Sequence, residues 1–323
     1  MGDFSTYIEA CGYGIVAPMA KNEPKPKIGF IGQGYIGKNY SDDFEQRGYD
    51  VVRYSLEPAY IHNKDKIQDC DIVFIAVWTP TTPKGFDSSI VENVLSLVGK
   101  GKIVVLKSTV VPGTTVALQK KFPKLTLMYS PEFLSVGTAA EDAKHPFSNI
   151  LGLPVADLAH KNAAQTVLGV LPKAPYELIC KSGEAEIIKY SHNLSGYTQI
   201  ITFNMLYEVS KKLGGDWGVV HNALLADPYI PNRYSQPVHK TGRGAGGGCF
   251  IKDFAAFRNL YKRMLPKDIE SINALIAIEK KNIQLLTSSK KDLELLVRVY
   301  GPKVVKTKVK PAVGRSASSR KAR

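Results

Sequence analysis

Short apolar runs separated by amphipathic stretches dominate the first half of the chain. The runs predict strands at residues 27–31, 50–54, 71–77, 102–106, 125–129 and 149–153. Stretches with helical periodicity lie between them, and a further helix and strand follow to about residue 179. Strands that alternate with helices indicate βαβ units, so we predict a mainly parallel sheet.

Helical periodicity marks the second half of the chain. Apolar residues recur at three- and four-residue spacing through 183–213, which predicts one long helix, and a second helical region follows at 268–300. Residues 1–26 show no clear periodicity. We therefore expect four segments, which are an N-terminal extension at 1–26, an α/β domain at 27–182, a helical domain at 183–300 and a tail at 301–323.

A glycine turn follows the first predicted strand. Gly32, Gly34 and Gly37 form a GxGxxG pattern that encloses Tyr35 and Ile36 and opens a helical segment. Gly32 permits the tight turn, Gly34 lets the backbone approach a pyrophosphate, and Gly37 allows close packing of the helix. This context predicts a Rossmann-type, doubly wound α/β domain that binds a dinucleotide.

The residues at the end of the second strand do not decide between NAD and NADP. An acidic residue there would hold the ribose 2′-hydroxyl of NAD, but Ser55 occupies this position. Either Glu57 reaches the ribose, or Ser55 with Arg53 or Arg47 accepts the 2′-phosphate of NADP.

Polar residues follow three later strands, at the edge of the sheet where ligands bind in this fold. The loop 78–83 is expected to lie over the cofactor and contains Thr79, Pro80 and Thr81. Thr109 follows the fourth strand and Glu132 the fifth. Each could be a turn or capping residue, but their shared edge makes both candidates for a functional site.

The long predicted helix carries Lys189 and Asn193, which are four residues apart and therefore project from one face. An ammonium and an amide side by side suit the stabilisation of an oxyanion.

The segment 242–253 holds five glycines in seven positions, followed by Cys249 and the start of another helix. Such a backbone adopts positive φ values and lies close to a ligand. The positive end of the helix dipole and Lys252 would both lower the pKa of the Cys249 thiol, and Asp253 lies on the same helical face. We predict a reactive cysteine here, which could trap a carbonyl covalently.

Composition describes a globular protein, with 44% hydrophobic and 9% aromatic residues. No apolar run is long enough to span a bilayer, and residues 1–20 lack the basic start of a signal peptide, so we expect a cytoplasmic protein. The net charge of +14 falls to +6 when the eight basic residues of 301–323 are removed. We expect this tail to be a solvated terminus, with non-specific contact to a polyanion as the alternative and no other nucleic-acid partner.

The four cysteines form no CxxC pair and the six histidines show no ligand spacing. We therefore predict neither a disulfide framework nor a metal site, and expect Cys70 and Cys180 to be packing residues.

Five features, taken in order, resemble the UDP-glucose/GDP-mannose dehydrogenases over roughly residues 27–290. They are the glycine turn, Lys107-Ser108-Thr109, Pro131-Glu132-Phe133-Leu134, the Lys189 and Asn193 pair, and GGxCFxKD at 246–253. The resemblance implies oxidation of the C6 alcohol of a nucleotide sugar to a uronic acid with two molecules of NAD, and a role in polysaccharide biosynthesis. It also implies a homodimer built on the long helix.

The resemblance further implies a role for each matching residue. Cys249 would form a thiohemiacetal and then a thioester, Lys189 and Asn193 would stabilise the oxyanions, and Asp253, Thr109 and Glu132 would handle the proton and the hydrolytic water. Ser108 and Lys252 would contact the cofactor. The sugar nucleotide would contact Phe133, Leu134, Lys240, Gly242, Gly244 and Gly246.

Three features depart from the family pattern. Val136 stands where an acid is usual, Tyr229 stands where an arginine is common, and nothing after Tyr300 is expected to form the C-terminal nucleotide-binding domain. Two alternatives remain, a single-step hydroxyacid dehydrogenase of the 6-phosphogluconate type and a catalytically silent protein that binds cofactor or a polyanion. Cys249 argues against the first, because that class needs no thiol.

Overall fold

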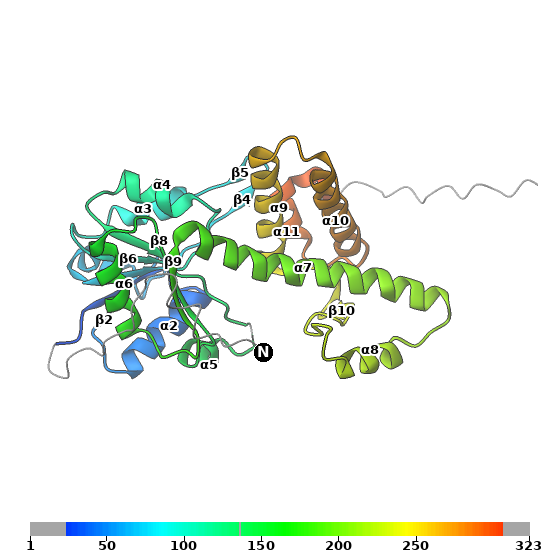
Figure 1. The fold of residues 1–323 in the computed structure, drawn as a ribbon, viewed down its shortest axis with the longest axis horizontal. Coiled ribbons are helices and arrows are strands. Elements are labelled where there is room, and N and C mark those ends of the chain that lie inside the picture. Colours follow the sequence, from blue (N-terminus) through cyan, green and yellow to red (C-terminus); the bar gives the residue numbers. More distant parts are fainter. Residues whose placement is uncertain (1–23, 136, 306–323) are drawn as a thin grey trace, which may run out of the picture. The chain divides into compact units, whose positions relative to one another are not determined.

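The computed structural model describes residues 24–135 and 137–305, so most of the predicted N-terminal extension, Val136 and most of the basic tail lie outside the described residues. Two compact units divide the chain between Ser195 and Gly196, within one long helix (Figure 1). We describe each unit by itself.

The first unit is built on a seven-stranded sheet with the order β2-β1-β3-β6-β7-β8-β9 (Figure 1). Neighbouring strands are parallel except for the antiparallel pair β7 and β8. The predicted Rossmann-type sheet is therefore confirmed. Its strands are β1 (Ile28–Ile31), β2 (Val51–Tyr54), β3 (Ile72–Ile75), β6 (Ile103–Leu106), β7 (Thr126–Tyr129), β8 (Asn149–Leu153) and β9 (Glu177–Lys181).

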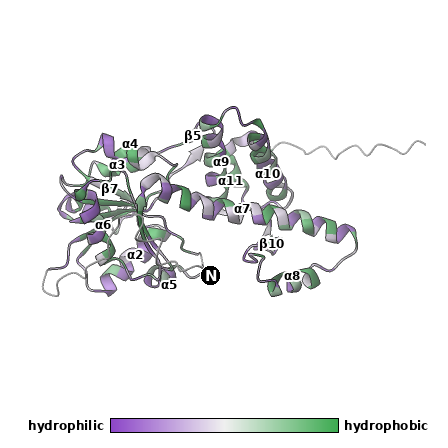
Figure 2. Cartoon of the chain, viewed as in Figure 1, coloured by the Kyte–Doolittle hydropathy of each residue, from purple (hydrophilic) through white to green (hydrophobic). Residues whose placement is uncertain are grey.

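Helices cover both faces of the sheet, because its central strands are apolar on both sides. Ile31 points into the core beneath α3 and α4, whereas Ile28 and Phe30 point into the core beneath α2, α5 and α6. Figure 2 shows the hydrophobic colouring of the strands. The helical elements are α2 (Tyr35–Gln46), η1 (Ile61–Asp69), α3 (Ser89–Leu95), α4 (Thr114–Lys121), α5 (Ala139–Lys144) and α6 (Leu158–Val170).

The loop predicted at 78–83 contains an additional hairpin. β4 (Thr81–Thr82) pairs with β5 (Gly85–Phe86) in the antiparallel sense. Gly85 has a φ of 112°, a value that a residue with a side chain rarely adopts, and this allows the tight reversal of the chain.

Helix α7 (Ser182–Lys212) is anchored to the first unit by a buried carboxylate. Glu186 is fully buried and accepts hydrogen bonds from the backbone amides of Gly113 and Thr115 and from the Thr115 hydroxyl, at 2.6, 2.9 and 2.6 Å. These amides begin α4, which has no side-chain cap of its own. Glu186 therefore caps α4 and fixes the turn of α7 that precedes Lys189.

The second unit packs three helices around a small apolar core. Ile251 and Ala255 of α9 meet Leu286 of α10 and Leu296 and Val299 of α11. Its elements are the C-terminal part of α7, α8 (Trp217–Ala226), β10 (Val238–His239), β11 (Gly242–Arg243), α9 (Gly247–Met264), α10 (Ile269–Ser288), α11 (Leu293–Tyr300) and η2 (Pro302–Val305).

The helical region predicted at 268–300 consists of two helices, α10 and α11. Lys290 and Asp292, in the linker between them, both have left-handed backbone conformations, with φ values of 56° and 51°. A helix cannot continue through such residues. Helix α8 was not anticipated from the sequence. No helix within the described residues is long and apolar enough to cross a membrane.

Candidate active site

The glycine turn after β1 has the shape that a dinucleotide requires. Gly32 has a φ of 93°, and a Cβ atom at this position would lie 2.4 Å from the carbonyl oxygen of Ala76. A Cβ at Gly37 would lie 1.8 Å from the carbonyl oxygen of Gly32. At Gly34, by contrast, no protein atom lies within 4 Å of the added carbon. Two glycines are thus required by the fold, while the third leaves the backbone open to a ligand.

The turn lies at the point where the strand order reverses, because β1 has β2 on one side and β3 on the other. In open α/β sheets this crevice binds the cofactor. Tyr35 and Ile36 begin α2 beside it, and the Tyr35 hydroxyl donates to the carbonyl oxygen of Ser135.

Hydrogen bonds join the loops that follow β3 and β6. The Thr79 hydroxyl donates to the carbonyl oxygen of Thr109 at 2.7 Å, and the Ser108 hydroxyl donates to the carbonyl oxygen of Val77 at 2.8 Å. Pro80 accepts a hydrogen bond from the amide of Asp87, and Thr81 lies in β4. The structure therefore brings together the predicted residues of these two loops, which anchor each other.

The residues around Ser55 favour NAD over NADP. Arg53 forms ion pairs with Asp42 and Glu45, both at 2.6 Å. Arg47 forms an ion pair with Asp43 at 2.8 Å and donates to the carbonyl oxygen of Val170. Both guanidinium groups are thus committed to other partners, so neither suits the predicted role of binding a 2′-phosphate.

Glu132 and Lys189 form a buried ion pair at the carboxyl edge of the sheet. The Lys189 ammonium lies 3.1 Å from Glu132 Oε1 and donates to the Glu132 carbonyl oxygen at 2.5 Å. The two residues are only 6% and 4% exposed. Each charge compensates the other, which is how an ion pair persists away from water.

A third charged side chain, Lys107, shares this environment. It is 3% exposed, its Nζ donates to the Ser130 hydroxyl at 3.1 Å, and it lies 4.4 Å from the centre of the Tyr40 ring. Burial lowers the pKa of Lys107 to about 8, against an opposing effect of the Glu132 charge, and the Lys189 charge lowers it further.

Sequence reasoning did not assign a role to Lys107. The available signal was a lysine placed directly after a fully apolar strand, where a charged side chain has little access to water.

Other predicted residues surround the ion pair. The Leu134 amide donates to Glu132 Oε2 at 3.0 Å, and the Phe133 ring lies 5.0 Å from His192 and 5.3 Å from the Lys189 ammonium. Asn193 is buried one turn after Lys189 on α7.

Side chains of α10 and its linker hold the glycine-rich loop of the second unit. Asn282 accepts from the Ala245 amide at 2.7 Å and donates to its carbonyl oxygen at 3.0 Å. Lys291 donates to the Gly244 carbonyl oxygen at 3.0 Å, and Asp292 accepts from the Gly247 amide at 2.8 Å. The loop is therefore held by side-chain hydrogen bonds at Gly244, Ala245 and Gly247.

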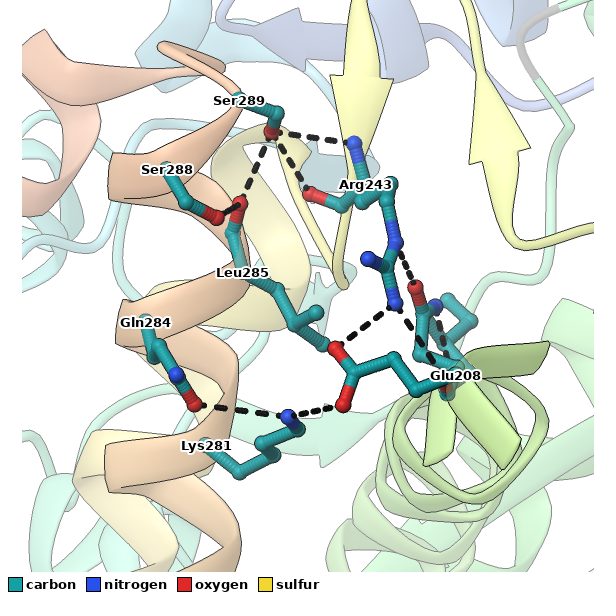
Figure 3. Close-up of polar contacts among 9 residues, drawn as sticks. Glu208, Arg243, Lys281, Gln284, Leu285, Ser288 and Ser289 are labelled. Atoms are coloured by element: carbon teal, nitrogen blue, oxygen red, sulfur yellow. Dashed lines mark hydrogen bonds and ion pairs between the residues drawn. The ribbon is translucent and has the colours of Figure 1, made fainter. Parts of the chain in front are cut away.

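Arg243 extends this set of bonds to α7. Figure 3 shows its backbone bonded to Ser289 and its guanidinium bonded to Glu208. The guanidinium also donates to Asn204 Oδ1 at 2.8 Å. Glu208 also accepts from Lys281 of α10 at 2.9 Å. The loop thus joins two helices of the second unit.

The glycines of this loop have a steric role that sequence analysis did not anticipate. A Cβ atom at Gly242 would lie 2.5 Å from the Ser289 hydroxyl, at Gly244 it would lie 2.9 Å from Asn282, and at Gly246 it would lie 2.0 Å from Asp292. The fold requires these glycines even without a ligand. Lys240, between β10 and β11, has a φ of 54°.

Cys249 is the third residue of α9, and it is exposed. Helix α9 starts at Gly247, in agreement with the prediction, and its first turn contains no acidic residue. Lys252 and Asp253 form a buried ion pair at 2.6 Å. Cys70 and Cys180 are buried as expected, and burial raises their pKa values to about 11 and about 12. Cys249 is thus the exposed thiol of the described part of the chain.

The sheet order and the open glycine turn define a dinucleotide-binding protein of the Rossmann class. Two models of the UDP-glucose/GDP-mannose dehydrogenase family match the chain, the NAD binding domain at residues 55–167 and the central domain at 183–282. The chain belongs to this family.

Curated relatives include the UDP-glucose 6-dehydrogenase AglM of Haloferax volcanii, which is 29% identical over 280 residues. The alignment covers 71% of this chain and 64% of that protein. The UDP-glucose 6-dehydrogenase TuaD of Bacillus subtilis is 29% identical over 282 residues, with 73% and 59% covered. The chain therefore spans less than two thirds of the length of these relatives.

Among solved structures, a UDP-glucose dehydrogenase of Pyrobaculum islandicum superposes with a TM-score of 0.70 at 26% identity, over 84% of this chain and 72% of that one. A 3-hydroxyisobutyrate dehydrogenase of Mycobacterium tuberculosis gives a TM-score of 0.59 at 14% identity, over 80% and 95%. The second likeness shows the shared fold alone.

No group of three histidine, cysteine or acidic side chains suited to a metal ion occurs within residues 24–135 and 137–305.

The contrast between Gly34 and Gly37 gives a paired test of the cofactor turn. Gly34→Ala adds a carbon to open space, so we expect an unchanged melting temperature but at least tenfold weaker NAD binding. Gly37→Ala forces a carbon against the Gly32 carbonyl, so we expect a loss of several degrees in melting temperature. Calorimetry measures the melting temperature of each variant, and titration with NAD measures its affinity for the cofactor. Tight NAD binding by Gly34→Ala would contradict the assigned role.

The depressed pKa of Lys107 predicts a specific dependence of stability on pH. Between about pH 8 and the ordinary lysine value of 10.5, the native state has released the proton that the unfolded state still holds. The free energy of unfolding therefore rises with pH across this window, by up to about 3 kcal/mol from this group. We expect Lys107→Met to lack this contribution. Urea titrations of both proteins at each pH measure the free energy of unfolding.

Lys64→Met is the matched control, because Lys64 is exposed and its removal leaves the dependence unchanged. A Lys107→Met protein with the same rise in stability between pH 8 and 10.5 as the unmodified protein would show that Lys107 titrates normally.

Proposed function

We propose that this chain carries out the NAD-dependent, four-electron oxidation of the C6 alcohol of a nucleotide sugar to the uronic acid. The observation that carries the proposal is an exposed thiol, Cys249, at the start of α9 after a loop that side chains hold firmly. Membership of the family and the NAD-type glycine turn support it.

In the proposed reaction, Cys249 acts as the nucleophile. Oxidation of the alcohol gives an aldehyde, and the Cys249 sulfur adds to its carbonyl carbon to form a thiohemiacetal. A second oxidation gives a thioester, which water hydrolyses to release the carboxylate and the thiol. Covalent attachment explains why no free aldehyde would leave the protein between the two oxidations.

Lys189 and Asn193 would stabilise the negative charge that develops on the substrate oxygen. Both are buried and lie four residues apart on α7, and the Lys189 ammonium is already oriented by Glu132. Donors that are fixed before the reaction stabilise a developing oxyanion at little cost in reorganisation. Lys189 and Asn193 are thus the proposed oxyanion donors.

Proton transfer and hydrolysis would involve carboxylates and one hydroxyl. Glu132 bears a second oxygen, Oε2, that accepts from the Leu134 amide, so both of its oxygens are held in place. Asp253 is buried and forms an ion pair with Lys252, and it would act as the base. Thr109 would position the hydrolytic water.

The residues of the first unit would hold NAD at the glycine turn. Gly34 offers the open backbone, and the loops carrying Thr79 and Ser108 border the same edge. Two NAD molecules, bound one after the other, would each accept one hydride, one for each oxidation. Lys252 is the remaining residue proposed to contact it.

UDP-glucose is the first substrate to test, because the curated relatives AglM and TuaD carry the name UDP-glucose 6-dehydrogenase. The sugar nucleotide would contact Phe133, Leu134, Lys240 and the loop glycines Gly242, Gly244 and Gly246. Its product would be a uronic acid donor for polysaccharide synthesis.

The ratio of reduced cofactor to consumed sugar tests the proposal. We expect two NADH per UDP-glucose, with NADP and other nucleotide sugars tested in parallel. One NADH per sugar would support the single-step hydroxyacid reaction instead. NAD binding without turnover of any sugar would support a silent binding protein.

Cys249→Ser separates the covalent step from the rest. The variant is expected to form no uronic acid while NAD binding stays unchanged, because Cys249 is exposed and its replacement conserves size. Ser210→Ala is the control, because Ser210 is an α7 residue without a proposed role in the reaction. Cys70→Ser would be unsuitable, since Cys70 is buried in the core. Acid formation by Cys249→Ser would eliminate the thioester mechanism.

We further propose that the chain forms a homodimer through α7. Large apolar side chains remain exposed in the single chain on the second half of this helix, at 46% for Met205, 49% for Leu206 and 58% for Val209, and at 81% for Leu213, which directly follows the helix. Exposed apolar groups clustered on one element are typical of subunit interfaces.

Light scattering at micromolar concentration measures the oligomeric state. We expect twice the chain mass of 35.4 kDa, and a monomer after Val209→Glu with Leu213→Glu. A monomeric unmodified protein would contradict the proposed dimer.

A further inference from the structure

Lys107 is a buried cationic side chain that lacks a carboxylate of its own. Within the described residues it forms no ion pair, although it is 3% exposed. Its contacts are the Ser130 hydroxyl at 3.1 Å and the face of the Tyr40 ring at 4.4 Å. A hydroxyl oxygen and an aromatic face stabilise an ammonium, but less than an ionised carboxylate does.

The surroundings of Lys107 come from three other elements of the first unit. Tyr40 belongs to α2, Ser130 and Glu132 follow β7, and Lys189 belongs to α7, while Lys107 itself follows β6. The titratable groups that face it are Tyr40, Glu132 and Lys189. Burial holds Tyr40 neutral by raising its pKa, and the Glu132 charge raises that pKa further.

The net charge of this cluster depends on one proton. With Lys107 protonated, two ammonium groups face one carboxylate and the cluster carries one positive charge. With Lys107 neutral, the Glu132 and Lys189 ion pair remains and the cluster carries none. The pKa of about 8 places this change near physiological pH.

We propose that Lys107 is a positioning residue whose ammonium sets the charge of the Glu132 and Lys189 pair and so favours negative charge on the substrate oxygen. The proposal rests on the function proposed above, because Glu132 and Lys189 take their roles from it. Lys107 acts through the electrostatic field, since its own Nζ is directed to Ser130 and the Tyr40 ring.

This arrangement predicts a loss of rate as pH rises. The excess positive charge stabilises an oxyanion, and it disappears when Lys107 releases its proton. We expect kcat to fall roughly tenfold through a midpoint near pH 8, because one charge in a buried cluster has an effect of that order.

The first experiment compares kcat and KM between pH 6 and 10 for the full chain and for Lys107→Met. We expect the variant to have a roughly tenfold lower kcat at pH 7, an unchanged KM for NAD, and no fall near pH 8. Lys64→Met, at an exposed site, should retain the unmodified profile. A purely structural role would lower activity without moving the profile, so a fall near pH 8 in Lys107→Met would overturn the proposal.

The second experiment needs no turnover and therefore separates this inference from the proposed function. Lysine labelled with ¹³C at the ε carbon is followed by NMR against pH, and the spectra of Lys107→Met and Lys189→Met assign the two resonances. We expect the Lys107 resonance to titrate near pH 8 and the Lys189 resonance to shift with it. In Lys107→Met that shift of Lys189 should vanish.

Two outcomes of the NMR experiment would overturn the inference. One is a Lys107 midpoint near the ordinary lysine value, and the other is a Lys189 resonance that still shifts near pH 8 in Lys107→Met. Thermal melting of each variant verifies that it is folded. If the labelled chain shows the coupled titration but oxidises no sugar, the charge coupling stands and the proposed function fails.

Discussion

Burial of the central strands on both faces is the constraint on which the first unit depends. A strand that is covered by helices on each side tolerates no unpaired polar group along its length, so polar side chains occur where the strands end. Parallel pairing then gathers those ends at one edge. Gly32, Thr79, Lys107 and Ser130 all lie there because each follows an apolar strand, and the chemistry of this unit is a consequence of that geometry.

In the second unit, a glycine-rich segment is ordered by its neighbours. The absence of side chains lets α10 and its linker approach the backbone, and the polar groups of Asn282, Lys291 and Asp292 then bond to that backbone directly. Glycine in this loop therefore provides space for a rigid contact, although it is usually associated with flexibility. Cys249, the third residue of α9, therefore follows a backbone that neighbouring side chains hold in place.

Much of this arrangement is readable from the sequence, for identifiable reasons. The strands and the glycine turn have local signals, and the ends of parallel strands share an edge, so the sequence anticipated that Glu132 lies at the carboxyl edge of the sheet. The surroundings of Lys107 have no local signal, because Tyr40, Ser130 and Lys189 come from distant parts of the chain. The same holds for the loop glycines Gly242 and Gly246, whose neighbours Ser289 and Asp292 are 47 and 46 residues away.

The two ion pairs of Arg53 have a consequence for attempts to redesign cofactor preference. A change of Ser55 alone adds no positive group for a 2′-phosphate, since the guanidinium of Arg53 is paired with Asp42 and Glu45. An engineer would have to neutralise both acids to release it, and would thereby remove the contacts that tie β2 to α2. Cofactor choice in this protein is coupled to the packing of helix α2.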